Sequence, residues 1–191
     1  MAHLTPHAHG LFARQHGTAS VEQLLATGLS LREIRHLQRA GDLELVLRGA
    51  YRTPSAPVTE ASRSAAVCLA RADVVVAGPT AGRLWGLRRL PFDRRVHVLA
   101  PRASQPAAVR WVVPYRTDAH HDRDVINRGD GIRITSRART ALDLARWLDA
   151  DDLLSVIEQV VHDGRLTDDD LLAVAVDWLS PQRPWIRHFL R

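Results

Sequence analysis

Apolar residues near the start of the chain recur with the spacing of three short helices, over residues 7–16, 20–28 and 30–41. Ser20 and Ser30 are each followed three residues later by Gln or Glu, which is typical of a capping box whose hydroxyl accepts a backbone N–H. A glycine closes both of these runs and suits the left-handed end of a helix. Two capped helices joined by a turn of about four residues are typical of a helix-turn-helix.

The third of these helices has two chemically different faces. Leu31, Ile34 and Leu37 recur at helical spacing, and we expect them to face the core. The opposite face is predicted to carry four donors, namely Arg32, Arg35, His36 and Arg39. An arginine fork binds the O6 and N7 of guanine or grips a phosphate, so this helix is predicted to enter the major groove of DNA. A solvated helix can also carry three arginines.

A hairpin is predicted directly after this helix. Residues 43–47 have leucine at every second position, which is the pattern of a strand with one buried face. Arg48 and Gly49 then supply a tight turn, and residues 50–53 form a short return strand. A hairpin in this place is a wing, and we expect Arg48 and Arg52 to meet the sugar-phosphate backbone of DNA.

The stretch Thr-Pro-Ser-Ala-Pro at residues 53–57 marks a boundary. We expect a winged helix-turn-helix DNA-binding domain over residues 1–55 and a mixed α/β domain over residues 59–191, with a small sheet and carboxyl-terminal helices. The fold class is therefore α+β. Helices are expected over residues 59–72, from Pro79, from Arg137 to Leu148, over 153–161 and from Thr167, and strands over 74–77, 96–99, 111–113 and 132–135.

The last helix is predicted to turn one apolar stripe towards the core. Leu171, Leu172 and Val176 are the residues expected to face inward. Thr167 is expected to cap this helix, and the three aspartates that follow it suit the positive end of the helix dipole. We therefore interpret residues 168–170 as part of a helix start and not as a catalytic cluster.

Composition narrows the chemistry open to the chain. All 26 basic residues are arginine, so a phosphate-loop lysine and a Schiff-base lysine are both excluded. Cys68 is the only cysteine, which excludes a disulfide within the chain and a cysteine-based zinc site. Its apolar neighbours predict a small buried side chain. The loop Asp118–Asp124, which contains His120 and His121, could in principle supply metal ligands, but these crowd into seven residues without a supporting pair elsewhere, and a polar loop explains the same residues. We expect no metal, no cofactor and no catalytic residues.

Charge is distributed unevenly along the chain. Residues 1–55 carry a net +2, residues 56–140 a net +8, and residues 141–191 a net −5. A basic body with an acidic end suits a polyanionic partner and a separate protein partner. The open alternative is that an excess of arginine over lysine merely decorates a solvated surface.

Two groups of arginines stand out within the basic segment. Phosphate contacts from the second domain, which raise affinity without adding sequence preference, are predicted for Arg88, Arg89, Arg94 and Arg95. A second group with the same predicted role comprises Arg133, Arg137 and Arg139. The alternative to phosphate binding is that both groups of arginines lie on a solvated face and pair with carboxylates of the acidic helices at the end of the chain.

The string LFARQHGTASVEQLLATGLSLREIRHLQRAGDLELVLRGAYRTP resembles the amino-terminal winged helix of AbiEi-family antitoxins from actinobacteria. The later strings TAGRLWGL, DGIRITSRARTALDLA and HDGRLTDDDL resemble the second domain of that family and follow in the same order. The resemblance implies a transcriptional repressor that regulates its own type IV toxin–antitoxin operon, with a nucleotidyltransferase-like toxin encoded nearby. It also implies that Arg32, Arg35, His36 and Arg39 are recognition-helix contacts and that Arg48 is a wing contact.

The resemblance has one departure, because the chain ends at Arg191, where many actinobacterial relatives continue into a nuclease-like domain. We therefore expect a form without the nuclease, and not an enzyme. The start of the chain has no basic segment followed by an apolar core, and its uncharged runs are too short to cross a bilayer, so we expect a cytoplasmic, nucleoid-associated protein without membrane partners. Two alternatives stay open: a protein-interaction module that neutralises a toxin or scaffolds a partner, and an enzyme left over from the nuclease-bearing relatives.

Overall fold

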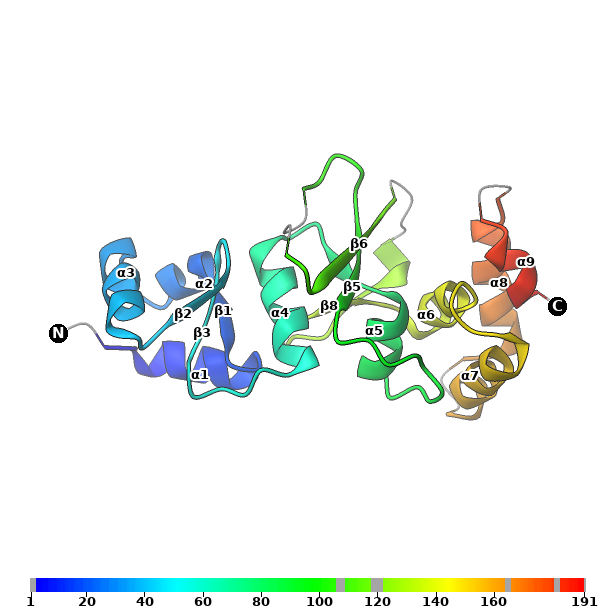
Figure 1. The fold of residues 1–191 in the computed structure, drawn as a ribbon, viewed down its shortest axis with the longest axis horizontal. Helices are drawn as coiled ribbons and strands as arrows, with labels where there is room; N and C mark the ends of the chain where they lie inside the picture. Colours follow the sequence, from blue (N-terminus) through cyan, green and yellow to red (C-terminus); the bar gives the residue numbers. More distant parts are fainter. Residues whose placement is uncertain (1–2, 106–108, 118–121, 164–165, 181–182, 191) are drawn as a thin grey trace.

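Three parts follow one another along the long axis of the molecule (Figure 1). The computed structural model describes residues 3–105, 109–117, 122–163, 166–180 and 183–190. Three helices and a small sheet lie at the amino-terminal end, a larger sheet with its helices lies in the middle, and a group of helices lies at the carboxyl-terminal end. The two termini are therefore at opposite ends of the molecule.

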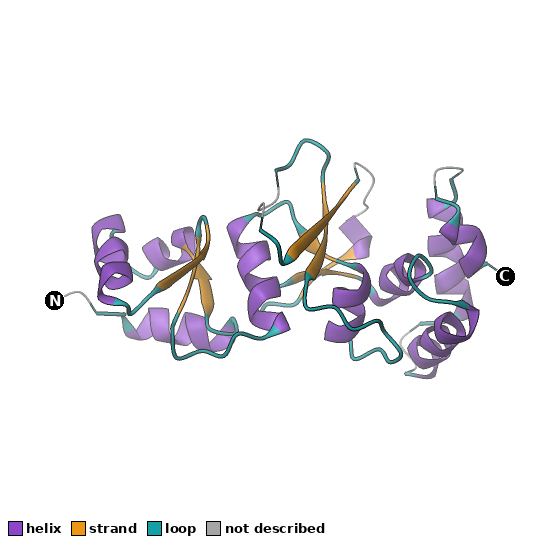
Figure 2. Ribbon diagram, viewed as in Figure 1, coloured by secondary structure: helices purple, strands orange, loops and turns teal. Residues whose placement is uncertain are grey.

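The structure confirms the α+β fold class, with a winged helix-turn-helix followed by a mixed α/β part and carboxyl-terminal helices (Figure 2). The helices are α1 (Pro6–Arg14), α2 (Val21–Ala26), α3 (Leu31–Ala40), α4 (Glu60–Ala70), α5 (Gly78–Leu84), α6 (Arg137–Leu144), α7 (Ala150–His162), α8 (Asp168–Trp178) and α9 (Trp185–Phe189). The strands are β1 (Thr18–Ser20), β2 (Glu44–Leu47), β3 (Ala50–Arg52), β4 (Val75–Val76), β5 (Val96–Ala100), β6 (Val112–Arg116), β7 (Val125–Asn127) and β8 (Arg133–Thr135), with one 3-10 turn, η1 (Asp122–Asp124).

Side-chain caps fix the ends of the helix-turn-helix as the sequence predicts. The Ser20 hydroxyl accepts the backbone N–H of Gln23 at 3.2 Å, and the Ser30 hydroxyl accepts that of Glu33 at 3.3 Å. In both boxes the longer side chain reaches back to the capping residue's own N–H. Gly41 ends α3 with a φ of +83°, a left-handed conformation that glycine adopts without strain.

The wing sheet has three strands in the order β1-β3-β2, all antiparallel. The sequence predicted β2 and β3 but not β1. β1 has only three residues, directly before the capped start of α2, so it is too short to show any alternation. Its pairing with β3 closes the sheet on the side away from β2.

Two leucines that were expected in the core are exposed. Leu31 is half exposed because it occupies the first turn of α3, whereas Ile34 and Leu37 are buried as predicted. Leu45 is also half exposed, and the reason is a β-bulge between Leu45 and Leu47 that shifts the register of β2 against β3. The bulge breaks the strict alternation that the sequence pattern suggested.

The larger sheet has five strands in the order β6-β5-β4-β8-β7. β5 pairs parallel with β6 and antiparallel with β4, while β8 pairs parallel with β4 and antiparallel with β7. Helix α4 packs small side chains, among them Ala65 and Ala66, against buried valines of β4 and β5. Figure 1 shows α4 on one side of this sheet and α5 on the other.

The amino-terminal part is packed directly against the middle part. Leu47 and Ala50 of the wing lie in the same buried cluster as the α4 residues. A Cβ added at Gly17 would clash with the Cβ of Ala56, so the linker runs tightly along the end of α1. The boundary predicted at residues 55–59 thus coincides with a close junction, in which α4 also contacts all three strands of the wing sheet.

The carboxyl-terminal helices surround α6, which contacts α5, α7, α8 and α9. Leu171, Ala175 and Trp178 of α8 are buried, but the predicted inward positions Leu172 and Val176 are more than half exposed. The prediction for those two residues is wrong, because α8 is covered only along the stripe that faces α6 and α9. Among the described helices, none combines the length and apolar character needed to cross a bilayer.

Candidate nucleic-acid interface

Helix α3 is held in place by its apolar side. Ile34 and Leu37 are each 1% exposed and pack in one cluster with Phe12 of α1 and Leu24 of α2. A helix anchored along one stripe necessarily presents the opposite stripe outward. The packing of α3 on its two predecessors therefore decides which of its polar side chains face solvent.

The polar side of α3 is exposed and unpaired. The side chains on it are Arg32, Arg35, His36 and Arg39, all exposed. None of the four forms an ion pair or a side-chain hydrogen bond with any residue that the structure describes. Glu33, on the same helix, is occupied in the capping box, where hydrogen bonds from Ser30 hold the pKa of its carboxyl below the usual range. These spacings of three and four residues place the donors on one outward surface, which we call the α3 face.

The two predicted wing residues have different surroundings. Arg48 is exposed and has no ion pair within the described chain, and it sits in the turn beside Gly49. The carbonyl of Gly49 accepts the backbone N–H of Val21 at 2.9 Å, so the turn is tied to the start of α2. Arg52 pairs with Glu44 at 2.6 Å and donates to the carbonyl of Ala56 at 2.9 Å, contacts that hold the hairpin and the linker together.

The basic loop after α5 is partly neutralised within the chain. The side chain of Arg89 lies 3.4 Å from Asp152, and that of Arg95 lies 2.9 Å from Asp93. Hydrogen bonds from Arg95 hold the pKa of the Asp93 carboxyl far below its ordinary value. Arg88 is exposed without an ion pair among the described residues, and the guanidinium of Arg94 lies 5.9 Å from the Phe92 ring.

The second group of arginines does not form a surface patch, which corrects the prediction made for it. Arg133 donates to backbone carbonyls of Cys68, Arg71 and Val74 and so ties β8 to the end of α4. Arg137 lies 4.9 Å from the Trp85 ring.

Arg139, the third member of that group, is only 5% exposed and donates to Asp143 at 2.9 Å. A group so enclosed does not reach the backbone of double-stranded DNA at the protein surface. Arg133 and Arg139 therefore hold the second part of the chain together.

The candidate metal loop lies only partly within the described structure. His120 and His121 are outside the described residues. Asp124 is buried and accepts a hydrogen bond from the Trp178 indole at 3.0 Å, so its carboxylate is used structurally. Among the described residues, no group of three potential ligands is placed to hold a metal ion. Cys68 is buried, which raises the pKa of its thiol and matches the prediction of a small core residue.

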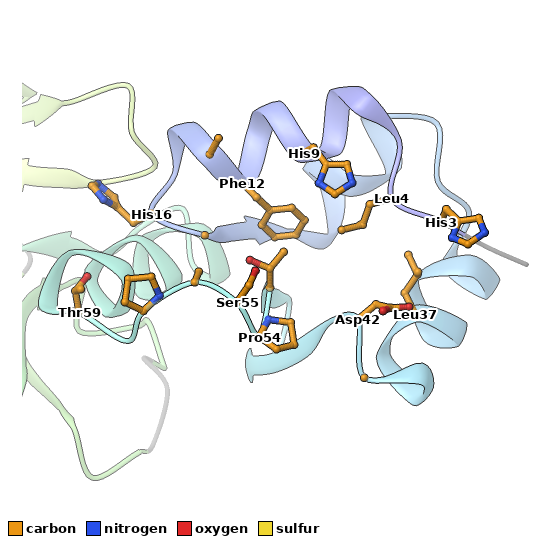
Figure 3. Close-up of a pocket in the computed structure, with 16 residues that line it drawn as sticks. His3, Leu4, His9, Phe12, His16, Leu37, Asp42, Pro54, Ser55 and Thr59 are labelled. Carbon is orange, nitrogen blue, oxygen red and sulfur yellow. The ribbon is translucent and has the colours of Figure 1, made fainter.

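A groove of about 850 Å³, which no sequence pattern predicted, lies between α1, the end of α3 and the linker. Figure 3 shows Leu4, His9 and Phe12 on one wall, with Pro54 and Ser55 of the linker on the other. None of the four donors of the α3 face lines this groove. The groove and the α3 face are therefore separate features of the amino-terminal part.

A second hollow, also missed by sequence reasoning, lies in the second part of the chain. Its lining brings together arginine and aromatic side chains from β6, α6 and the start of α9, and from the segments after β5, after α6 and before α9, and we call it the arginine–aromatic cleft. The charged and aromatic residues that line it are Arg102, Tyr115, Arg116, Arg139, Asp143, Arg146, Trp147, Arg183 and Trp185. These residues are spread over more than eighty positions, so no local pattern could have revealed the cleft.

Comparison with known proteins agrees with this architecture. Residues 11–54 match the model of a family described as transcriptional regulator, AbiEi antitoxin. A solved structure of the RV2827C protein from Mycobacterium tuberculosis is similar in fold, with a TM-score of 0.53 and 18% identity, over 85% of this chain and 67% of that one. A search of curated proteins found no match. The winged helix-turn-helix segment of this chain is thus similar to the AbiEi antitoxin family of transcriptional regulators.

Proposed function

We propose that the protein is a sequence-specific DNA-binding repressor that regulates its own operon as the antitoxin of a type IV toxin–antitoxin pair. The observation that carries the proposal is the α3 face, a row of exposed donors without partners in the described chain. Unpaired guanidiniums lose no internal contact when they bind DNA, so their full hydrogen-bonding capacity is available to base edges and phosphates. The family match over residues 11–54 supports the same conclusion.

In this proposal α3 enters the major groove and the rest of the molecule positions it. Arg35 and His36 lie at the middle of the α3 face, where contact with base edges is expected, and Arg32 and Arg39 flank them. Arg48 contacts the backbone from the wing, whereas Arg52 acts mainly through Glu44 and Ala56. The side chains proposed to add phosphate contacts from the second domain are Arg88, Arg89, Arg94 and Arg95.

The partners follow from this role. The DNA partner is the double-stranded operator upstream of the protein's own gene, and the second partner is a nucleotidyltransferase-like toxin encoded nearby. We place the protein in the cytoplasm, on the nucleoid, and assign it no cofactor and no catalytic activity. Incubation with labelled DNA and a divalent metal tests the last point, and we expect no cleavage.

The proposal is tested by measuring affinity for DNA from upstream of the gene and for a scrambled duplex of the same length, by fluorescence anisotropy. We expect tight binding to the upstream DNA and weaker binding to the scrambled DNA. Both affinities should fall between about 50 mM and about 200 mM salt, because bound guanidiniums release counterions from the phosphates. Equal affinity for the two duplexes would exclude sequence-specific recognition.

A second candidate function is supported by the exposed apolar side of α8. Leu172 and Val176 are more than half exposed beside the acidic start of that helix. Exposed apolar side chains at one end of a molecule suit contact with another protein. A protein-interaction module that neutralises a toxin would form a stable complex with the neighbour-encoded protein in size-exclusion chromatography and would bind neither duplex.

A further inference from the structure

The arginine–aromatic cleft has the dimensions and the position of a ligand site. Its volume is about 450 Å³, within the range of small-molecule pockets. It lies beside the parallel strands β5 and β6, where Leu99 and Tyr115 are register partners and both line it. Residues that follow β5 and β6 also line it, together with residues of α6, of the segment after α6 and of the start of α9. Open α/β sheets commonly bind ligands beyond the carboxyl ends of such strands.

The aromatic side of the cleft is held in a fixed orientation. A Cβ on Gly78, whose φ is +53°, would lie 2.9 Å from the Trp147 ring, so the absence of a side chain there lets the indole lie against the backbone. The Tyr115 ring meets that of Trp147 edge to face at 5.3 Å. The Tyr115 hydroxyl lies 3.0 Å from Nδ1 of His97, whose Nε2 lies 3.0 Å from Asp93.

Arg146 is placed among three aromatic rings. Its guanidinium carbon lies 5.0 Å from the centroid of Tyr115, 5.6 Å from that of Trp147 and 5.4 Å from that of Trp185. Arg146 is nevertheless exposed, and it has no ion pair among the described residues. Cation–π contacts orient the guanidinium without consuming its N–H donors. Arg146 therefore presents an oriented positive charge with free donors at the mouth of the cleft.

The inner end of the cleft contains polar atoms without partners. Arg139 and Asp143 line the cleft, and the Nη1 of Arg139 and the Oδ2 of Asp143 are buried without a hydrogen bond to a described residue. The Nη1 of Arg139 forms an ion pair with the Oδ2 of Asp124, but the two atoms are 3.6 Å apart, which is beyond hydrogen-bond range. Burial and the nearby charge of Arg139 lower the pKa of Arg183, another lining residue. An unsatisfied guanidinium donor beside an excess of positive charge is expected where an anion binds, whereas the unsatisfied Asp143 oxygen is an acceptor and does not attract an anion.

Charge and shape together define the ligand class. Five arginines and a single carboxylate line the cleft. Arg139 pairs with Asp143, and Arg116 donates to backbone carbonyls, but the lining keeps an excess of positive charge that a neutral apolar ligand would not offset. A lone phosphate would leave most of the volume and all three aromatic rings unused. A flat ring joined to phosphate groups uses both, because the rings offer stacking surface and the arginines offer paired donors.

We propose that the arginine–aromatic cleft binds a nucleotide, with its base beside Trp147, Tyr115 and Trp185 and its phosphates on the arginines. The nucleotide is either free in solution as a nucleoside triphosphate or part of a single-stranded nucleic acid. Figure 1 shows α3 at the amino-terminal end of the molecule, away from β6, α6 and α9, which line the cleft, so this site is distinct from the proposed operator-binding surface.

The test uses the full chain and follows binding by tryptophan fluorescence and calorimetry. ATP, GTP, CTP and UTP are titrated separately, with tripolyphosphate as a ligand that lacks a base and a short single-stranded oligonucleotide as the polymeric source. We expect at least one nucleoside triphosphate to bind and to quench fluorescence, because Trp147 and Trp185 line the cleft. If the oligonucleotide binds more tightly than the nucleoside triphosphates, and if substitutions in the cleft abolish that binding, the natural ligand is a single-stranded nucleic acid and not a free nucleotide.

Matched variants connect binding to the cleft. Arg146→Gln and Arg102→Gln change exposed lining residues from different segments, and Arg110→Gln changes an exposed arginine outside the lining. We expect each of the first two to weaken binding by about tenfold or more, as loss of a charge-assisted contact does, and the third to have no effect. Circular dichroism checks that all three variants fold.

Three results would overturn the proposal. The first is no response to any nucleotide or to the oligonucleotide at about 1 mM. The second is tripolyphosphate binding as tightly as the triphosphates, which would remove the role of the aromatic rings. The third is equal weakening by Arg110→Gln and Arg146→Gln.

Discussion

The arginines of the amino-terminal part and those of the second part of this protein have opposite environments. On α3, Arg32, Arg35 and Arg39 are exposed and form no ion pair with any described residue. In the second part, Arg133 donates to three backbone carbonyls, and Arg139 is buried against carboxylates and the Trp178 ring. A chain without lysine uses one residue type both to hold its fold and to face a partner. Sequence position alone does not distinguish the two uses, but burial and pairing do.

The comparison also shows why net charge is a poor guide to the interface. The segment 56–140 carries the largest positive charge of the chain. Much of that charge is already compensated, because Arg83 bonds Glu60, Arg95 bonds Asp93, and Arg133 bonds carbonyl groups. The amino-terminal part has a smaller net charge but a larger share of unpaired guanidinium groups. Available charge, and not total charge, is the quantity that predicts a polyanion surface.

The largest effect is expected from Arg139→Met. The side chain of Arg139 is enclosed with Asp143 and Asp124, and removing it leaves two buried carboxylates without their cation. Breaking such a buried pair typically costs about 3 to 5 kcal/mol. Urea denaturation should show this loss, while the folded variant keeps its affinity for the operator. A loss below about 1 kcal/mol would show that the arginines of the second part are not structural in the way described.

The next effect concerns the two sides of α3. Ile34→Ala removes a fully buried side chain, and we expect a loss of roughly 2 to 5 kcal/mol in the free energy of unfolding. Leu31→Ala, on the same helix but half exposed, is the matched control and should change stability by about 0.5 kcal/mol or less. Equal losses for the two variants, measured by urea denaturation, would contradict the packing of α3 described above.

Acid should destabilise the protein through His97, which lies in the second part. Burial lowers the pKa of His97 below its usual 6.5, so the folded state holds this ring neutral while the unfolded chain takes up a proton. Stability from this group is therefore complete above pH 6.5 and declines as the pH falls below that value.

Urea midpoints at pH 7.5 and 5.5 measure this decline. His97→Gln should reduce the difference between the two midpoints. The exposed histidine of the α3 face supplies the control, because His36→Gln should leave the wild-type difference intact. A decline that is identical in His97→Gln and the wild type would assign the acid sensitivity to another group.

The smallest effect is expected from Arg94→Ala. Arg94 is exposed in the basic loop, and it is proposed to contact phosphate and not bases. Its removal should weaken specific and scrambled duplexes about equally and should reduce the slope of log affinity against log salt by about 1. Anisotropy titrations at several salt concentrations measure this slope. Loss of sequence preference in this variant would show that the second part reads bases, contrary to the comparison.

The helix-turn-helix could be predicted from sequence because its signals are local. Capping boxes at Ser20 and Ser30 and a glycine end at Gly41 each act within four residues, and the structure contains all three. The errors come from tertiary context. Leu31 and Leu45 fit their periodic patterns but fall outside the core, one at a helix start and the other beside a β-bulge.

The environments of the arginines could not be predicted, because their partners are distant in sequence. Arg133 bonds Cys68 and Arg71 more than sixty positions away. The arginine–aromatic cleft is assembled from still more widely separated residues. Only the folded structure shows that the Arg139 side chain is buried whereas the Arg35 side chain is exposed to solvent. The role of the α3 face in DNA binding stays a prediction made from sequence, and the structure supplies its geometry.

The central claim is tested most directly by the affinity of Arg35→Ala for operator and scrambled DNA, relative to wild type. Arg35 lies at the middle of the α3 face, is exposed, and contributes no ion pair among described residues, so the variant should fold normally. We predict a loss of about 1 to 3 kcal/mol on the operator, a much smaller loss on scrambled DNA, and a relaxed base preference. Unchanged operator affinity in a folded Arg35→Ala variant would contradict the assignment of α3 as the recognition helix.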